Sequence, residues 1–290
     1  MYEQFYNLKS KPFSLLPDPE YLYFSKRHSL AYGMLKYGLQ DDSGGFAVIT
    51  GEVGAGKTTL LNKLLTAIDE RTTVGLISQT QRNSDELFRW VMMSYKLPYQ
   101  GMDKVELYER FVEFTEQQYA KGKCCLLIID EAQNLELEAL EELRMLTNVN
   151  TDRGQKLKLI LSGQPQLLAK LKMPELKQFA QRVAIQYHLD SLNKEEGLEY
   201  IRHRLRKAGA DADLIDEGAS TIVWYYSRGI PRVMNKLCDM SLVYGFAEQR
   251  QNINAELVKK VIQDREIGGL FSDSNLDDNN ERLLLDALDR

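Results

Sequence analysis

Two short segments carry residue types that suit phosphate chemistry. The first, Gly51–Thr58, reads Gly-Glu-Val-Gly-Ala-Gly-Lys-Thr and fits the pattern of glycine, four residues, then Gly-Lys-Ser/Thr. Such glycines let the backbone bend until its N–H groups surround phosphate oxygens, and the helix that follows adds its positive dipole end. Lys57 then reaches the terminal phosphates and the Thr58 hydroxyl binds Mg²⁺, so the segment predicts a site for ATP and magnesium. The residues expected to hold the nucleotide are Gly51, Glu52, Val53, Gly54, Ala55, Gly56, Lys57, Thr58 and Thr59.

The second segment is an apolar run, residues 124–129, that ends in Asp130 and Glu131. The carboxyl end of a parallel strand is where an α/β sheet places its ligand site. We expect Asp130 to hold Mg²⁺, directly or through water, and Glu131 to orient the attacking water and accept its proton. An isolated Asp-Glu pair after a strand is more often a solvated turn, and the phosphate loop upstream favours the catalytic interpretation.

Three further residues are candidates for contacts with the transferred phosphoryl group. The apolar run 157–162 ends in Ser162-Gly163-Gln164, and either Ser162 or Gln164 suits a contact with the γ-phosphate or the attacking water; we favour Gln164. Arg182 and Arg232 suit stabilisation of phosphoryl charge, one from a neighbouring subunit and one within its own chain. Each arginine taken alone also fits a surface ion pair.

The elements that must position these residues follow from the apolar periodicity. Short apolar runs alternate with helical patterns up to residue 190, which predicts a parallel sheet covered on both faces, the P-loop NTPase αβα sandwich. Beyond residue 190, four amphipathic patterns predict a small all-helical domain. The expected strands are 46–50, 73–78, 124–129 and 157–162, and the expected lid helices are 194–208, 212–227, 231–248 and 254–265. The expected domains are a 1–40 lead-in packing on the ATPase core, a 41–190 nucleotide-binding domain, a 191–267 lid, and a flexible acidic 268–290 tail.

Composition indicates an ordinary globular chain of 290 residues with 43% hydrophobic and 27% charged residues. The formal net charge of -5 provides no global positive field toward DNA or acidic lipid. We expect no secretory signal and no direct membrane span, because no basic, apolar leader and no run of about 18 apolar residues occurs. The cysteines and histidines lack metal-site spacing, which favours reduced thiols, structural or surface histidines and a cytoplasmic location. The basic run 202–207 fits a solvated helix face.

With these residues the sequence resembles the ExeA/GspA-type branch of the AAA+ ATPases, a bacterial group linked to secretion-pathway assembly, pilus biogenesis and exopolysaccharide export. The resemblance covers residues 1 to about 265 and is much more specific than a phosphate loop alone. Besides that loop, it rests on segments 5–9, 11–14, 17–19, 21–23, 130–133, 163–165, 181–182 and 229–232.

The resemblance implies a role for each candidate residue. It assigns Lys57 and Thr58 to nucleotide and magnesium, Asp130 to magnesium, and Glu131 to water activation. It makes Gln164 a first sensor of the γ-phosphate. It also makes Arg182 a finger that acts on a neighbouring subunit's nucleotide, and Arg232 the sensor carried by the lid, in contact with the nucleotide.

The resemblance further implies a homo-oligomer, ring or filament, that powers or regulates assembly of an envelope export or pilus machine. Secretion-type members commonly continue into a membrane span and a cell-wall-binding domain, whereas this chain ends in a short acidic tail. We therefore expect a shorter cytoplasmic relative that reaches the inner membrane through partner proteins. Two alternatives remain: a DNA-binding regulator resembling transposition ATPases, disfavoured by the acidic balance, and a non-hydrolysing nucleotide-gated adaptor, disfavoured by Glu131.

Overall fold

The computed structural model describes residues 1–40, 45–78, 86–150 and 154–267. The chain forms two compact units. One comprises Asp18–Asp190; the other combines Met1–Pro17 with the chain from Ser191 onward. The acidic tail expected at residues 268–290 lies outside the described residues.

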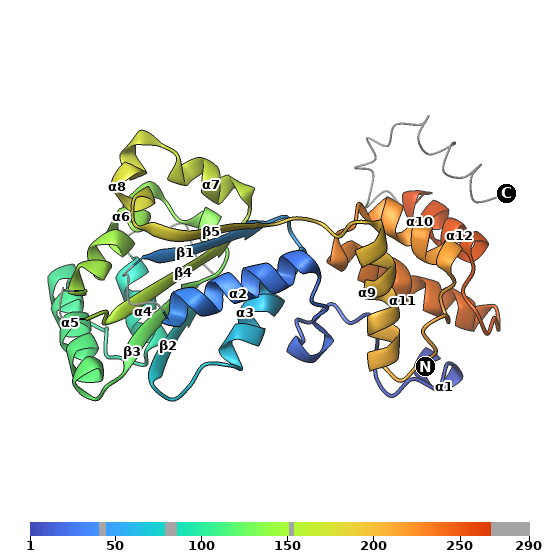
Figure 1. The fold of residues 1–290 in the computed structure, drawn as a ribbon, viewed down its shortest axis with the longest axis horizontal. Helices are drawn as coiled ribbons and strands as arrows, with labels where there is room; N and C mark the ends of the chain where they lie inside the picture. Colours follow the sequence, from blue (N-terminus) through green and yellow to red (C-terminus); the bar gives the residue numbers. More distant parts are fainter. Residues whose placement is uncertain (41–44, 79–85, 151–153, 268–290) are drawn as a thin grey trace. The chain divides into compact units, whose positions relative to one another are not determined.

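The first unit is built on a five-stranded sheet in the order β2-β3-β4-β1-β5, and all its strand pairs are parallel (Figure 1). Parallel pairing brings the carboxyl ends of the strands to one edge, where polar residues follow β1, β3 and β4. The predicted αβα class is confirmed. The fifth strand was not predicted, because its apolar pattern is interrupted by a polar Gln-Tyr-His stretch. The strands are β1 (Phe46–Gly51), β2 (Thr72–Ile77), β3 (Cys124–Ile129), β4 (Leu157–Gly163) and β5 (Val183–Leu189).

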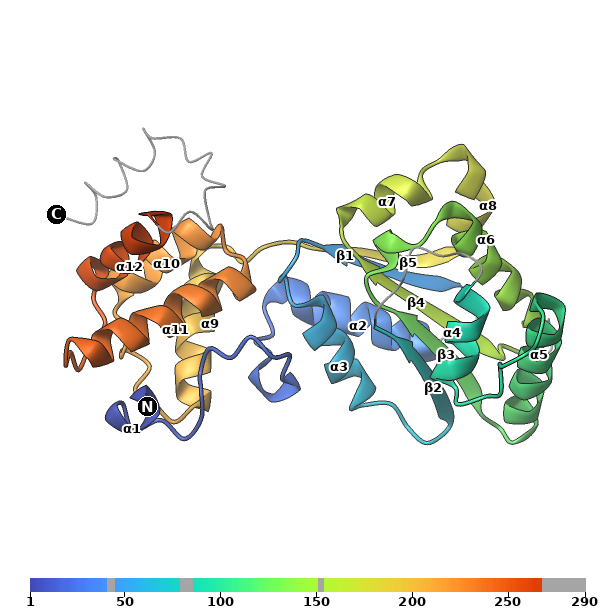
Figure 2. The ribbon, with the colours of Figure 1, turned by 180° about the vertical axis from the view of Figure 1, so that it is seen from behind.

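Helices cover both faces of this sheet because successive strand residues point to opposite sides. In β3, Leu126 and Ile128 join the core beneath α2 and α3, whereas Leu127 and Ile129 join the core beneath the other helices. The face carrying α2 and α3 is turned toward the viewer in Figure 1, and that carrying α4 in Figure 2. The helices are α2 (Lys26–Gln40), α3 (Lys57–Leu65), α4 (Leu87–Ser94), α5 (Lys104–Ala120), α6 (Leu137–Leu146), α7 (Pro165–Leu171) and α8 (Lys177–Ala180).

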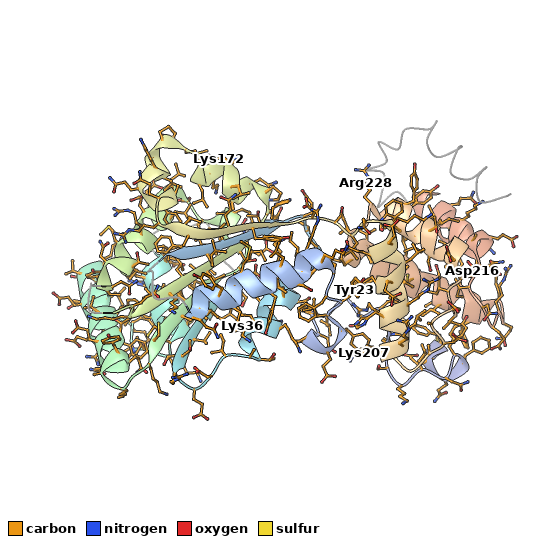
Figure 3. The ribbon with its side chains drawn as sticks, viewed as in Figure 1. Tyr23, Lys36, Lys172, Lys207, Asp216 and Arg228 are labelled. Carbon is orange, nitrogen blue, oxygen red and sulfur yellow. The ribbon has the colours of Figure 1, made fainter. Side chains whose placement is uncertain are left out.

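The second unit is helical, as the sequence predicted beyond residue 190. Side-chain caps fix the starts of the helices at Lys194 and Glu217: Asn193 forms a capping box with Glu196, and Asp216, labelled in Figure 3, accepts a 2.7 Å hydrogen bond from Ala219 N. α10 ends at Ser227, and its C-cap residue Arg228, labelled in the same figure, adopts a left-handed conformation with φ 51°. The helices are α1 (Tyr2–Phe5), α9 (Lys194–Lys207), α10 (Glu217–Ser227), α11 (Pro231–Ala247) and α12 (Ala255–Ile267).

The first seventeen residues differ from the prediction that residues 1–40 pack on the ATPase core. They pack instead on the helical unit, where the buried Arg204 donates hydrogen bonds to the carbonyls of Pro12 and Ser14. Lys9 N also donates to Ala208 O at 2.8 Å. The prediction missed this attachment because Arg204 lies in a basic run that fits a solvated helix face. Residues 18–40 of the lead-in belong to the sheet unit.

Candidate functional site

The loop between β1 and α3 has the backbone shape that a phosphate-binding loop requires. Gly54 and Gly56 have φ values of 85° and 100°, a region that glycine enters without a steric penalty. A Cβ on Gly56 would also lie 3.0 Å from His28 Nε2. The first hydrogen bond within α3 runs from Leu60 N to Gly56 O. The backbone N–H groups of residues 57–59 come before it and have no acceptor within the helix, so they remain available to an anion.

The Lys57 side chain lies within the curve of this loop. It is 6% exposed, and its Nζ donates to Gly51 O at 2.8 Å and Glu52 O at 2.9 Å. Burial lowers the pKa of Lys57, while the carboxylates of Glu131 and Asp130 oppose that shift by favouring the charged form. The loop therefore holds a cation that is poorly hydrated, which strengthens its attraction for an anion.

His28 supports the same loop from the start of α2. The imidazole is 3% exposed; its Nε2 lies 3.1 Å from Ala55 O and its Nδ1 lies 2.8 Å from Ser25 Oγ. Because a carbonyl oxygen only accepts hydrogen bonds, Nε2 carries the hydrogen that is donated to Ala55 O. His28 was expected to be structural or superficial, and the structure gives it a supporting contact to the phosphate loop.

Thr58 and Asp130, the two predicted magnesium ligands, are brought together from different elements. Thr58 Oγ1, in the first turn of α3, donates to Asp130 Oδ2 at 2.6 Å just beyond β3. Hydroxyl and carboxylate oxygens are hard ligands that suit Mg²⁺, which is commonly bound by one or two protein groups, water and substrate phosphates. The described residues contain no cluster of three or more His, Cys, Asp or Glu side chains that would form an all-protein metal cage. The residues present thus fit a magnesium ion shared with a nucleotide.

Ser162 provides a further polar atom at this edge of the sheet. β3 pairs with β4 with Ile129 opposite Leu161, so Asp130 and Ser162 each follow that pair on adjacent strands. The Ser162 side chain is fully buried, and Oγ has no hydrogen-bond partner within the described segments of the chain. Burying a hydroxyl without a hydrogen-bond partner costs free energy. Such a group is expected where a ligand or its bound water completes the hydrogen bonding.

Glu131 is held by two side-chain amides. It occupies the left-handed region with φ 54°, and its Oε2 accepts from Gln133 Nε2 at 2.6 Å and from Gln164 Nε2 at 3.4 Å. The backbone N–H of Gln164 in turn donates to Gln133 Oε1 at 2.9 Å. Gln164 therefore lies beside Glu131, whereas Gln133 was part of the sequence motif but had no assigned role.

Arg182 lies at the opposite edge of the same sheet. It precedes β5, and its carbonyl accepts a 2.7 Å hydrogen bond from Phe46 N, the first residue of β1. Its guanidinium donates to Thr147 Oγ1 at 2.8 Å and Asn148 Oδ1 at 2.9 Å. Within one chain Arg182 is thus at the amino ends of the strands and the phosphate loop at their carboxyl ends.

Arg232 belongs to the helical unit, where it is exposed in the first turn of α11. The preceding turn depends on Gly229, which has φ 69° and whose Cβ would lie 2.1 Å from Leu192 O. Leu192 N donates to Gly229 O at 2.9 Å, which ties the turn before α11 to the segment that precedes α9. The role of Arg232 toward nucleotide remains a prediction.

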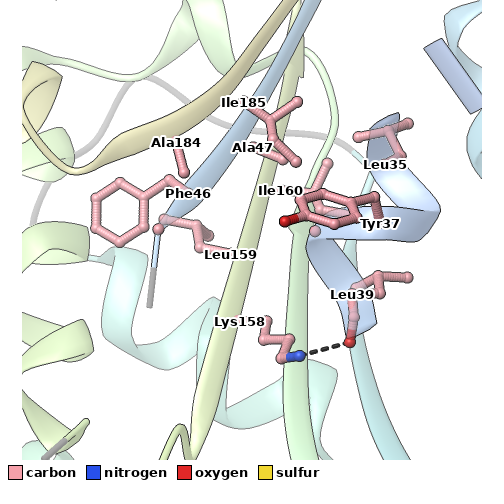
Figure 4. A pocket seen from close by; sticks show the side chains of 12 residues that line it. Leu35, Tyr37, Leu39, Phe46, Ala47, Lys158, Leu159, Ile160, Ala184 and Ile185 are labelled. Atoms are coloured by element: carbon pink, nitrogen blue, oxygen red, sulfur yellow. Dashed lines mark hydrogen bonds between the residues drawn. The ribbon is translucent and has the colours of Figure 1, made fainter. Parts of the chain in front are cut away.

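A separate hollow of about 260 Å³ lies at the amino ends of β1, β4 and β5, beside the last turn of α2 (Figure 4). Its lining is largely apolar, with Leu35, Phe46 and Ile185 among its side chains. The Lys158 ammonium donates to Leu39 O. Among the described residues that line this hollow there is no carboxylate, and its lysine contacts a carbonyl.

These features define the P-loop class of αβα proteins with an appended helical unit. The family model described as "AAA domain" matches residues 40–171. "General secretion pathway protein A" of Aeromonas hydrophila is 38% identical over 254 residues, which cover 87% of this chain and 46% of that protein. Over these residues the chain is similar to AAA proteins and to this relative, and it spans about half of the relative's length.

Solved structures with the same fold are more distant in sequence. ORC2 of Aeropyrum pernix, determined in ADPNP-ADP complexes, gives a TM-score of 0.62 at 18% identity over 83% of this chain and 67% of that chain. A Walker-type ATPase of Pyrococcus abyssi gives 0.61 at 17% identity over 89% and 78%. RuvB of Thermotoga maritima gives 0.54 at 19% identity over 82% and 67%. None of the helices in the described ranges is long and apolar enough to cross a membrane.

Proposed function

We propose that this chain binds ATP with Mg²⁺ at the β1–α3 loop and hydrolyses it to ADP and phosphate. The observation that carries the proposal is the 2.6 Å hydrogen bond from Thr58 to Asp130, because it joins the phosphate loop to the carboxylate strand. Lys57 is buried in the same loop, and the carboxylates of Glu131 and Asp130 favour its charged form. This combination of groups suits a triphosphate, its metal and an attacking water.

In the proposed reaction, backbone N–H groups of the loop and Lys57 bind the β- and γ-phosphates. Glu131 orients a water molecule and accepts its proton as the water oxygen bonds to the γ-phosphorus. The bond between that phosphorus and the β–γ bridging oxygen breaks, and ADP and inorganic phosphate leave. Thr58 and Asp130 would hold a magnesium ion, which would supply charge neutralisation at the phosphate oxygens.

The remaining predicted residues fit an enzyme that acts as a homo-oligomer, ring or filament. Gln164 contacts Glu131 and is placed to respond to the γ-phosphate. Arg182, at the other edge of the sheet, is suited to a nucleotide bound by a neighbouring copy of the chain rather than by its own. Arg232, from the helical unit, is proposed to contact the nucleotide in its own chain.

The relative's name suggests the cellular context of the proposed ATPase. We place the chain with proteins that assemble or regulate an envelope export system of the secretion, pilus or exopolysaccharide kind, as the 38% identity to "General secretion pathway protein A" favours. ATP supply puts the active unit on the cytoplasmic side, where partner proteins would bring it to the inner membrane. Copurification of such membrane-complex proteins with the native chain is the observation that would support this context.

The contacts of the basic run on α9 weaken the DNA-binding alternative. Arg204 is buried against Pro12 and Ser14, and Arg206 pairs with Glu199 at 2.6 Å. These groups are therefore partly neutralised or inaccessible to a phosphate backbone. A gel-shift assay at physiological salt, with and without ATP, distinguishes the two functions: ATP-dependent retention of DNA would favour the regulator.

The proposal is tested by replacing the loop lysine. Lys57→Ala removes the buried cation and should abolish binding of a fluorescent ATP analogue and phosphate release. Lys63→Ala is the matched control, because Lys63 lies in the last turn of the same helix and outside the site. Equal ATP binding by the Lys57→Ala and Lys63→Ala proteins would refute the assignment of the nucleotide site.

A further inference from the structure

Gln133 forms hydrogen bonds through both its side chain and its backbone beside Asp130 and Glu131, and the proposed function gives it no role. It lies in the short 3-10 turn Ala132–Asn134 that follows Glu131. Its Nε2 donates to Glu131 Oε2 at 2.6 Å and its Oε1 accepts from Gln164 N at 2.9 Å. Its backbone carbonyl accepts from Lys170 Nζ at 2.6 Å. One side chain thus links the end of β3 to the start of α7.

The neighbouring elements make room for Gln133 and fix its position. β4 ends at Gly163, where a Cβ would lie 2.9 Å from Gln133 Oε1 and 3.2 Å from Gln133 N. Any larger residue at 163 would displace the glutamine from the carboxylate. Lys170, on α7, donates to the carbonyls of both Gln133 and Leu135, so the turn is held at two points.

Only glutamine supplies both hydrogen bonds at this place. Its amide is a donor and an acceptor on one planar group, so the group that fixes Glu131 is itself oriented by Gln164 N. Glutamate at 133 would keep the acceptor and lose the donor, and methionine would lose both. The 2.6 Å contact joins an amide to a carboxylate, and such charge-assisted hydrogen bonds are stronger than neutral ones.

We propose that Gln133 is a positioning residue for Glu131: its side-chain amide holds the carboxylate in the orientation that receives the proton of the attacking water. This inference rests on the proposed ATPase function, since it concerns the same carboxylate. The carboxylates of Glu131 and Asp130 both favour the charged form of Lys57. Fixing one carboxylate oxygen through Gln133 directs the other toward the reacting atoms. Gln164 Nε2, at 3.4 Å from the same oxygen, contributes less.

The test compares Gln133→Met and Gln133→Glu with the control Gln118→Met. Gln118 is a half-buried glutamine on α5 that accepts from Thr73 Oγ1 at 3.0 Å, outside the site. For Gln133→Met, kcat should fall about 10- to 100-fold, the range for losing a hydrogen bond to a charged group. The affinity for ATP, measured in the Glu131→Gln background with and without the second change, should stay within about twofold, because Gln133 contacts no element of the phosphate loop.

Gln133→Glu gives a second readout that a purely structural role would not move. Glutamate keeps the acceptor for Gln164 N and lacks the donor to Glu131, so kcat should fall in this variant as it does in Gln133→Met, whereas kcat of Gln118→Met should match that of the parent. The affinity for ATP should again stay within about twofold, which separates loss of the donor from a loss of the fold. Lys57, Asp130 and Lys170 are present in all these proteins, so they do not account for a difference.

The outcomes separate this inference from the proposed function. If the unmodified chain hydrolyses ATP and Gln133→Met keeps its kcat, the positioning role is overturned while the ATPase stands. A fall in kcat accompanied by an equal loss of ATP affinity or of folded protein in both Gln133 variants also overturns it, because the role would then be structural. If the unmodified chain does not hydrolyse ATP at all, the proposed function fails first.

Discussion

The carboxylates of Asp130 and Glu131 are adjacent in sequence and take different partners. Asp130 Oδ2 accepts the Thr58 hydroxyl, while Glu131 Oε2 accepts side-chain amides of Gln133 and Gln164. The left-handed conformation of Glu131 makes this division possible, because it turns the chain directly after the strand. One carboxylate is thereby directed to the Thr58 hydroxyl and the other to the amides of Gln133 and Gln164.

A prediction at this scale concerns Ser162, whose buried hydroxyl lacks a protein partner in the described part of the chain. Ser162→Ala removes an unsatisfied polar atom, so the nucleotide-free protein should become more stable by about 1 kcal/mol. In the same variant, Mg²⁺ and ATP should stabilise the fold less than they stabilise the parent. Urea unfolding with and without Mg²⁺ and ATP measures both effects; a clear loss of stability in the nucleotide-free variant would contradict the account.

At the scale of elements, the phosphate loop is supported by α2 as well as by the strand and helix that flank it. His28, in the first turn of α2, contacts the Ala55 carbonyl and lies against Gly56. Ser25 caps this helix, since its Oγ accepts from His28 N at 3.2 Å while also contacting the imidazole. The loop conformation therefore depends on a segment about thirty residues upstream of it.

His28→Ala should weaken ATP binding about three- to tenfold, the effect of losing one hydrogen bond that orders the loop. His28→Gln is the matched variant, because its amide nitrogen can occupy the place of Nε2 and donate to Ala55 O. It should retain most of the affinity. Isothermal titration with a slowly hydrolysed ATP analogue gives both constants, and unchanged binding in His28→Ala would show that the contact does not support the loop.

The αβα class could be predicted because short apolar runs alternate with helical patterns up to residue 190. The phosphate loop could be predicted because its residues have a fixed spacing. Lys57, Thr58 and Asp130 could be singled out as candidates because phosphate binding and magnesium ligation favour those residue types. His28 and Gln133 could not be assigned roles in this way, since their partners are a backbone carbonyl and a carboxylate brought close only by folding. The attachment of residues 1–17 escaped prediction because Arg204 binds carbonyl groups, which carry no sequence signal.

At the scale of the whole molecule, the two edges of the sheet carry different candidate groups. The carboxyl edge holds the phosphate loop and the carboxylates, and the amino edge holds Arg182. An arginine that participates in hydrolysis from that edge must act on a second copy of the chain. If Arg182 has this role, the proposed activity requires assembly of the chain.

Arg182→Ala should bind ATP normally and lose the rise in specific activity with protein concentration. Mixing it with the Lys57→Ala protein should restore turnover, because one chain then supplies the nucleotide site and the other the arginine. Phosphate release measured over a range of mixing ratios tests this complementation. Loss of ATP binding in Arg182→Ala, or no recovery on mixing, would contradict a role between subunits.

The central claim, that Glu131 activates water at a Mg²⁺–ATP site built by Thr58 and Asp130, is tested most directly by the nucleotide retained by Glu131→Gln. The amide is nearly isosteric and cannot accept the proton, so hydrolysis should slow about 10²- to 10⁴-fold while ATP remains bound. Single-turnover quench analysis of bound nucleotide should recover ATP from the variant and ADP from the parent. Recovery of ADP from both at the same rate would contradict the claim.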